Sequence, residues 1–140
     1  MQTSDIIACL ALFFSVIAVP IGYYLGVRNI RNSTYNAEID SMNLLLREIY
    51  NEAIGIHQNW DELTIDIYTQ IMIANHKRLQ TKCNQLHDIY TGYPRDQLRR
   101  AKKILTDDLL SECEIVRKTA IRDLIYRLDD IQIFYKKRFF

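Results

Sequence analysis

Three side chains in the middle of the chain have the types and spacing that a metal site would use. His76, Cys83 and His87 are seven and four residues apart, so a helix would place them along one stripe. Imidazole and thiolate groups are zinc ligands. Cys83, however, also continues an apolar stripe with Leu79 and Leu86, which is an ordinary place for a core cysteine. We therefore predict no metal and assign these residues to a packed helix.

Motifs for other enzyme chemistry are missing from the sequence. The chain contains no glycine-rich phosphate loop, no Cys-x-x-Cys pair and no His-Glu-x-x-His motif. Two of its four glycines lie inside an apolar segment, which leaves little for an active-site loop. The glycosylation sequon at Asn32 lies too close to a predicted membrane span to be used. We expect a protein that is not an enzyme, with no cofactor and no small-molecule substrate.

A basic cluster is the remaining candidate for a binding site, either for anionic lipid headgroups or for nucleic acid. Its members are Arg95, Arg99, Arg100, Lys102 and Lys103. If the turn at 90–94 returns to a membrane, these side chains lie at anionic headgroups, and the alternative is a solvated helix face. The whole chain has a net charge of +1, and Asp5 is the single charged residue before Arg28, so residues 28–140 carry +2. That balance argues against a dedicated nucleic-acid binder.

An apolar segment at residues 6–27 is predicted to hold these side chains near a membrane. Its 22 residues carry no charge, and as a helix of about 33 Å they would cross a hydrocarbon core of about 30 Å. A cleaved signal peptide fits less well, because residues 1–5 contain no Lys or Arg and the apolar run is too long. All 18 Lys and Arg residues follow Val27. The positive-inside rule thus predicts an inner or plasma membrane span with the N-terminus outside and the C-terminal part in the cytoplasm.

Small residues recur along one face of this predicted span. They are Ala8, Ala11, Ser15, Ala18, Gly22 and Gly26. Helices in lipid associate mainly through close packing, which small residues permit, so the stripe predicts self-association or pairing with a partner helix. Such a stripe also arises by chance, since these residue types are common in membrane helices. Pro20 removes one backbone hydrogen bond and is predicted to kink the helix.

The next segment has a heptad pattern. The predicted seam consists of Ile39, Met42, Leu46, Ile49, Ala53, Ile56 and Trp60. Steps of three and four residues predict a helix over 34–60 in a bundle or coiled coil, with Ser33 or Thr34 as its N-cap after a linker at 28–33. Alternatively, one seam continues through Asn32 and couples the span to the cytoplasmic helix.

Two more helices are expected, over 61–90 and 95–138. Asp61 and Glu62 suit a first helical turn, and the apolar face is Leu63, Ile67, Ile71, Ala74, Leu79, Cys83, Leu86 and Tyr90. The second face is Leu98, Ala101, Leu105, Leu109, Cys113, Val116, Ala120, Leu124, Leu128, Ile131 and Tyr135. The polar stretch at 106–108 leaves open whether this is one helix or two.

The fold prediction is therefore all-α, with a single N-terminal transmembrane helix followed by a cytoplasmic antiparallel bundle or coiled coil of about three long helices. The predicted boundaries are a tail at 1–5, the span at 6–27, the linker at 28–33, the bundle at 34–138 and a tail at 139–140. Acidic and basic blocks alternate along the chain, which favours antiparallel neighbours.

Three functions fit these features. The first is a membrane-anchored protein that binds the lipid bilayer and oligomerises or binds a partner protein, which in one version is a membrane-perturbing effector or toxin of a bacterial or phage defence system; that version rests on analogy of architecture. The second is a non-toxic scaffold or regulatory subunit of a membrane complex. The third is a spanin-like linker of opposite topology, against which the basic flank after the span argues.

Overall fold

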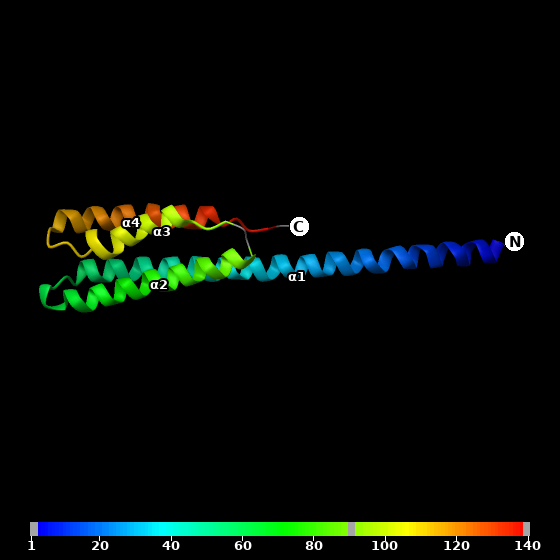
Figure 1. Cartoon of the computed structure of the whole chain (residues 1–140), viewed down its shortest axis with the longest axis horizontal. Coiled ribbons are helices and arrows are strands. Elements are labelled where there is room, and N and C mark those ends of the chain that lie inside the picture. Colours follow the sequence, from blue (N-terminus) through cyan, green and yellow to red (C-terminus); the bar gives the residue numbers. More distant parts are fainter. Residues whose placement is uncertain (1–2, 90–91, 139–140) are drawn as a thin grey trace. The chain divides into compact units, whose positions relative to one another are not determined.

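The computed structural model describes residues 3–89 and 92–138, and these are almost entirely helical. The α-helices are α1 (Thr3–Gln58), α2 (Ile65–Ile89), α3 (Arg95–Lys103) and α4 (Glu114–Phe134), as Figure 1 shows. A 3-10 turn, η1 (Glu62–Thr64), precedes α2, and a π-helical turn, η2 (Ile104–Asp108), follows α3. The described residues contain no strand, so the protein is all-α.

The chain divides into two units. One comprises residues 1–36 with 138–140, and the other comprises residues 37–137. We call the second the packed unit.

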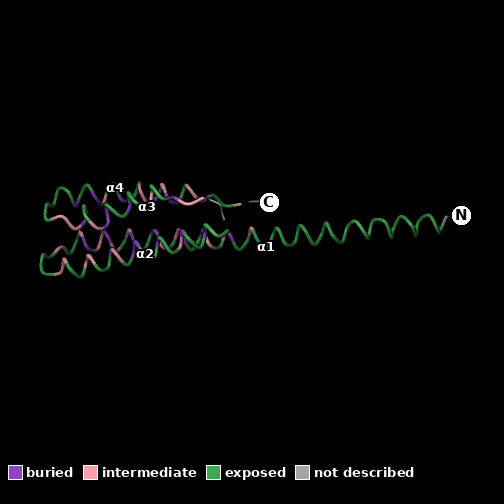
Figure 2. Tube along the Cα trace, viewed as in Figure 1, coloured by how far each residue is buried: buried purple, intermediate pink, exposed green. Residues whose placement is uncertain are grey.

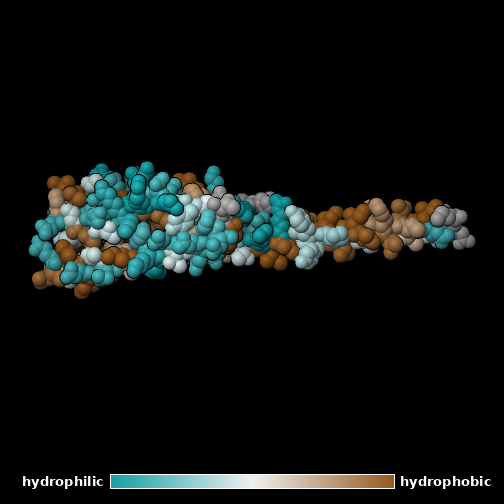
Figure 3. Space-filling view, in the orientation of Figure 1, coloured by the Kyte–Doolittle hydropathy of each residue, from teal (hydrophilic) through white to brown (hydrophobic). Residues whose placement is uncertain are grey.

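The N-terminal unit consists mainly of the first part of α1. Residues 4–31 are all exposed, and the apolar segment contains a stretch long and apolar enough to cross a membrane (Figures 2 and 3). The helix continues through Pro20 without a break. The Ser15 hydroxyl donates to the Ala11 carbonyl at 2.9 Å, so the helix itself satisfies this polar group.

A continuous helix replaces the linker predicted at 28–33. Neither Gly nor Pro occurs between Gly26 and Gly55, and the polar residues from Arg28 to Asn32 do not interrupt a helix. The Thr34 hydroxyl donates to the Ile30 carbonyl one turn earlier rather than capping a new helix. The linker prediction and its N-cap are therefore wrong.

The packed unit begins with an antiparallel pair formed by the second part of α1 and α2. Glu38 pairs with Lys82, Glu48 with Arg78, and Glu52 with Asn75, so positions rise along one helix as they fall along the other. In the connection, the Asp61 side chain accepts from the Leu63 amide at 3.1 Å and caps η1. Because α2 runs antiparallel to α1, Ile89 at the end of α2 and Pro94 shortly after it lie at the same end of the packed unit as Glu38.

The buried face of α1 coincides with the predicted seam. Ile39, Met42, Leu46, Ile49, Ala53 and Ile56 are buried, and Trp60 is half-buried after the helix end. Apolar side chains recurring at steps of three and four residues lie on one side of a helix, so this side faces the core.

The predicted apolar face of α2 is wrong in its first half. Leu63, Ile67, Ile71 and Ala74 are exposed, and Tyr90 lies outside the described residues. The step from Ala74 to Leu79 is five residues, which rotates the face by roughly 140° at 3.6 residues per turn. The first half of α2 therefore faces the core through another side than the one predicted. The buried residues of α2 are Met72, Asn75, His76, Leu79, Cys83 and Leu86.

The segment predicted as a helix over 95–138 forms two helices that lie side by side (Figure 1). The Leu109 amide donates to the Ile104 carbonyl at 2.9 Å, which closes η2, and the chain then turns through residues 109–113. Cys113, at the end of this turn, and Val116, in the first turn of α4, are exposed, unlike the rest of their predicted face. The second helix ends at Phe134 rather than 138.

Candidate functional site

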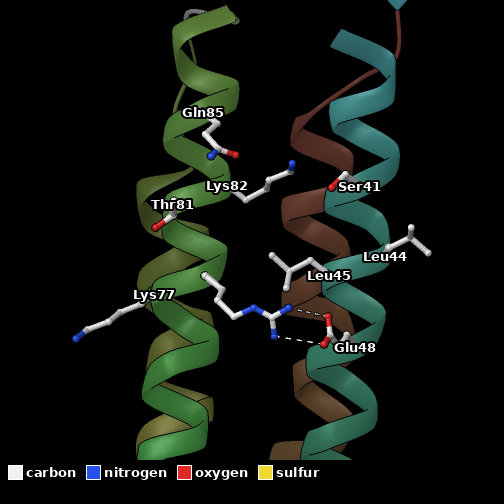
Figure 4. A pocket seen from close by; sticks show the side chains of 9 residues that line it. Ser41, Leu44, Leu45, Glu48, Lys77, Thr81, Lys82 and Gln85 are labelled. Carbon is white, nitrogen blue, oxygen red and sulfur yellow. Dashed lines mark hydrogen bonds and ion pairs between the residues drawn. The ribbon is translucent and has the colours of Figure 1, made fainter. Parts of the chain in front are cut away.

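Two grooves flank α2, one on the α1 side and one on the α3 side. The first has a volume of about 540 Å³ and is lined by residues of α1 and α2 (Figure 4). Two Arg78 nitrogens hydrogen-bond the two Glu48 carboxylate oxygens at 2.9 and 3.4 Å, and Lys82 pairs with Glu38. Two of the three cations that line this groove, Arg78 and Lys82, are therefore paired with acids of α1, and the third is Lys77.

The second groove lies between α2 and α3 and is strongly basic. Its volume is about 330 Å³. The lining residues are Ile73, His76, Lys77, Gln80, Tyr93, Arg95, Leu98, Arg99, Lys102 and Thr106. Four of them are Lys or Arg and none is Asp or Glu. We call this groove the basic pocket.

The helices position these cations without burying them. Lys77 follows the buried His76 on α2 and points away from α1, as Figure 4 shows. Arg95, Arg99 and Lys102 lie three or four residues apart on α3, so they share a face, and buried Leu98 and Ala101 anchor that helix to the core. Arg99 also lies 4.0 Å from Asp96, but both side chains are largely exposed, so this pair is weak.

His76 forms the inner wall of the basic pocket. It is 9% exposed, and its Nε2 is buried without a hydrogen-bond partner. Burial lowers the pKa of His76; a hydrogen bond with the Leu98 backbone acts in the opposite direction, and the Lys102 charge adds to the lowering. The ring is therefore neutral at pH 7 and has one unused nitrogen beside four positive side chains.

The structure brings together only part of the predicted basic cluster. Arg95, Arg99 and Lys102 line the pocket, whereas Arg100 and Lys103 are exposed and do not. His76, Lys77 and Tyr93 were not part of the sequence prediction for this site. Lys77 and His76 belong to another helix, and no spacing within 95–103 signals them.

The other predicted site residues lie as follows. His76 and Cys83 are buried and His87 is exposed, and the described residues contain no group of three His, Cys, Asp or Glu side chains suited to a metal. Burial raises the pKa of the Cys83 thiol to about 11, so it stays protonated. Along the small-residue stripe, a Cβ added at Gly22 or Gly26 would meet no atom within 4 Å.

Comparison with models of protein families, with curated proteins and with solved structures gives no match for this chain.

Proposed function

We propose that this protein is a non-enzymatic, single-pass membrane protein whose cytoplasmic antiparallel helical bundle binds a partner or a second copy. The observation that carries the proposal is the exposed apolar surface of α1. From Ile6 to Ile30, fifteen large hydrophobic side chains are at least 40% exposed. Water-exposed apolar surface of this extent is typical of a membrane or protein interface, and a lipid bilayer would bury all sides of the helix at once.

Charge substitution tests the membrane anchor. An Arg near the centre of a membrane helix costs roughly 2.5–3.5 kcal/mol on insertion scales. The double variant Leu12→Arg with Val16→Arg should therefore leave the membrane fraction after alkaline carbonate extraction. Leu63→Arg with Ile67→Arg, on two exposed side chains of the packed unit, is the matched control and should stay. If the double variant also remains membrane-bound, the proposed span is refuted.

The native cysteines provide a test of topology. Cys113 is exposed, Cys83 is buried with a raised pKa, and Cys9 lies in the apolar segment. A membrane-impermeant maleimide should label Cys113 only after the cells are permeabilised, and Cys113→Ser should abolish that labelling. Labelling in intact cells would place the packed unit outside and support a linker of spanin-like topology instead.

The open space beside Gly22 and Gly26 supports association of the span with another helix. Gly22→Leu or Gly26→Leu should reduce cross-linking between copies in membranes, whereas Val16→Leu, on another face of the helix, should not. Inducible expression then separates the two versions of the function. Growth arrest with membrane depolarisation, abolished by the Gly variants, would support an effector. Normal growth with a stoichiometric co-purifying partner would support a scaffold or regulatory subunit.

A further inference from the structure

We propose that the basic pocket between α2 and α3 binds a phosphate group. The binding residues are Lys77 of α2 and Arg95, Arg99 and Lys102 of α3, with His76 at the inner wall. All of them belong to the packed unit, so the proposal is independent of whether α1 enters a membrane.

The charges of the pocket define the ligand as an anion. Four cationic side chains line it with no carboxylate among the lining residues, whereas in the groove on the other side of α2 the cations Arg78 and Lys82 are paired with acids of α1. Like charges held in one concave surface repel one another, and a bound anion relieves that repulsion. The pocket therefore lacks the counter-charge that the neighbouring groove has.

The types of side chain favour phosphate over a carboxylate. Two arginines present planar donor forks that match phosphate oxygens, and two lysines add point charges from both sides. A phosphate can accept hydrogen bonds from several donors at once, whereas a carboxylate has only two oxygens. The volume of about 330 Å³ accommodates a phosphate together with a small substituent such as a sugar or a glycerol unit.

His76 is the second, independent observation. Its Nε2 is buried and has no hydrogen-bond partner in the protein, which is an unfavourable state for a buried polar atom. In the neutral ring the Nδ1–H donates to the Leu98 backbone, so Nε2 is an acceptor, and the protonated oxygen of a hydrogen phosphate can donate to it. The pocket thus contains both excess positive charge and an unused hydrogen-bonding atom.

The test uses the full chain in a nonionic detergent and follows the ³¹P resonance of inorganic phosphate at fixed ionic strength. The pocket variant is Arg99→Ala with Lys102→Ala, and the control is Arg100→Ala with Lys103→Ala. Both remove the same two charges from α3, and all four side chains are exposed, so both variants should keep the fold. Far-UV circular dichroism checks this.

We expect the pocket variant to bind phosphate about 100-fold more weakly, at about tenfold for each lost charge-assisted contact, and the control to change by less than about threefold. Equal weakening by both variants would show diffuse charge attraction and overturn the proposal. Absence of phosphate binding to the unsubstituted protein, in every arm below, would overturn it as well.

Two further arms distinguish the source of the phosphate. One uses glucose 6-phosphate in solution, and the other uses detergent micelles that contain phosphatidic acid, with phosphatidylcholine micelles for comparison. Binding of the soluble phosphate that depends on Arg99 and Lys102 supports a soluble ligand. Pocket-dependent broadening of the phosphatidic acid resonance alone supports a lipid headgroup.

Discussion

The Arg117 side chain contacts both the turn before α4 and the segment between α1 and α2. Its replacement tests how much these contacts stabilise the packed unit. The side chain is 6% exposed, and its guanidinium carbon lies 4.1 Å from the centroid of the Trp60 ring. Its Nη1 donates to the carbonyls of Ser111 and Glu112, both at 2.7 Å. One buried cation therefore satisfies two turn carbonyls and packs on an aromatic ring.

The expected cost of Arg117→Met follows from these contacts. Methionine fills similar space but leaves both carbonyls without this donor, and each hydrogen bond to a charged group contributes about 1.5–3 kcal/mol. The cation–π contact adds about 0.5–2 kcal/mol, and release of the guanidinium from burial offsets part of the sum. We expect the free energy of unfolding to fall by about 2–4 kcal/mol.

Chemical unfolding of the full chain in detergent, followed by circular dichroism, measures this change. Arg122→Met, on an exposed side chain of the same helix, is the control and should stay within about 0.5 kcal/mol of the unsubstituted protein. In a Trp60→Leu background the cost of Arg117→Met should shrink by about 1 kcal/mol, the coupling between ring and cation. A cost within the control range, or an unchanged cost without Trp60, would refute the reasoning.

Three further predictions concern α2. Leu79→Ala should lower the free energy of unfolding by about 2–5 kcal/mol, whereas Leu63→Ala should change it by less than about 0.5 kcal/mol, because Leu79 is fully buried and Leu63 is 92% exposed; equal effects would contradict the assigned core face. The raised pKa of Cys83, about 11 against an ordinary 9.0, means that its neutral thiol stabilises the fold below pH 9 and that this stability is lost as pH rises toward 11. In urea unfolding, the loss of stability at alkaline pH should therefore be smaller for Cys83→Ala than for the unsubstituted protein. An identical loss in the two proteins would exclude Cys83 as its source. The lowered pKa of His76 means that the unfolded chain binds the proton more readily, so stability should fall as pH drops below about 6.5. His76→Gln should flatten this acid slope in thermal melts, and an unchanged slope would exclude His76 as its source.

Sequence periodicity was sufficient to predict the buried side of α1 but not the buried side of α2. The heptad seam from Ile39 to Ile56 predicted the buried side of α1, because a regular step of three and four residues keeps one side of the helix against its neighbours. The predicted face of α2 has a five-residue step after Ala74, and periodicity alone could not show which side of the helix lies against the core before that step. Packing against the neighbouring helices decides that, and it buries Met72 and Asn75 in line with Leu79.

The break between α3 and α4 had only a weak sequence signal. The segment from Arg95 to Lys137 contains no Gly or Pro, and its apolar spacing continues across the turn. The chain nevertheless turns at 109–113, where the buried Arg117 side chain supplies donors to the turn carbonyls. A turn stabilised by a side chain several residues away has no local composition signal, so helix propensity favours a single helix.

The sequence by itself determined that the chain is helical and that its first segment is apolar enough to span a membrane, because these properties depend on local periodicity and composition. It also identified the basic residues of 95–103. Only the tertiary structure decided that three of them share a pocket with His76 and Lys77 of α2, while Arg100 and Lys103 do not line it. The physical reason is that a pocket between two helices depends on their relative rotation, which long-range core packing sets and local sequence does not.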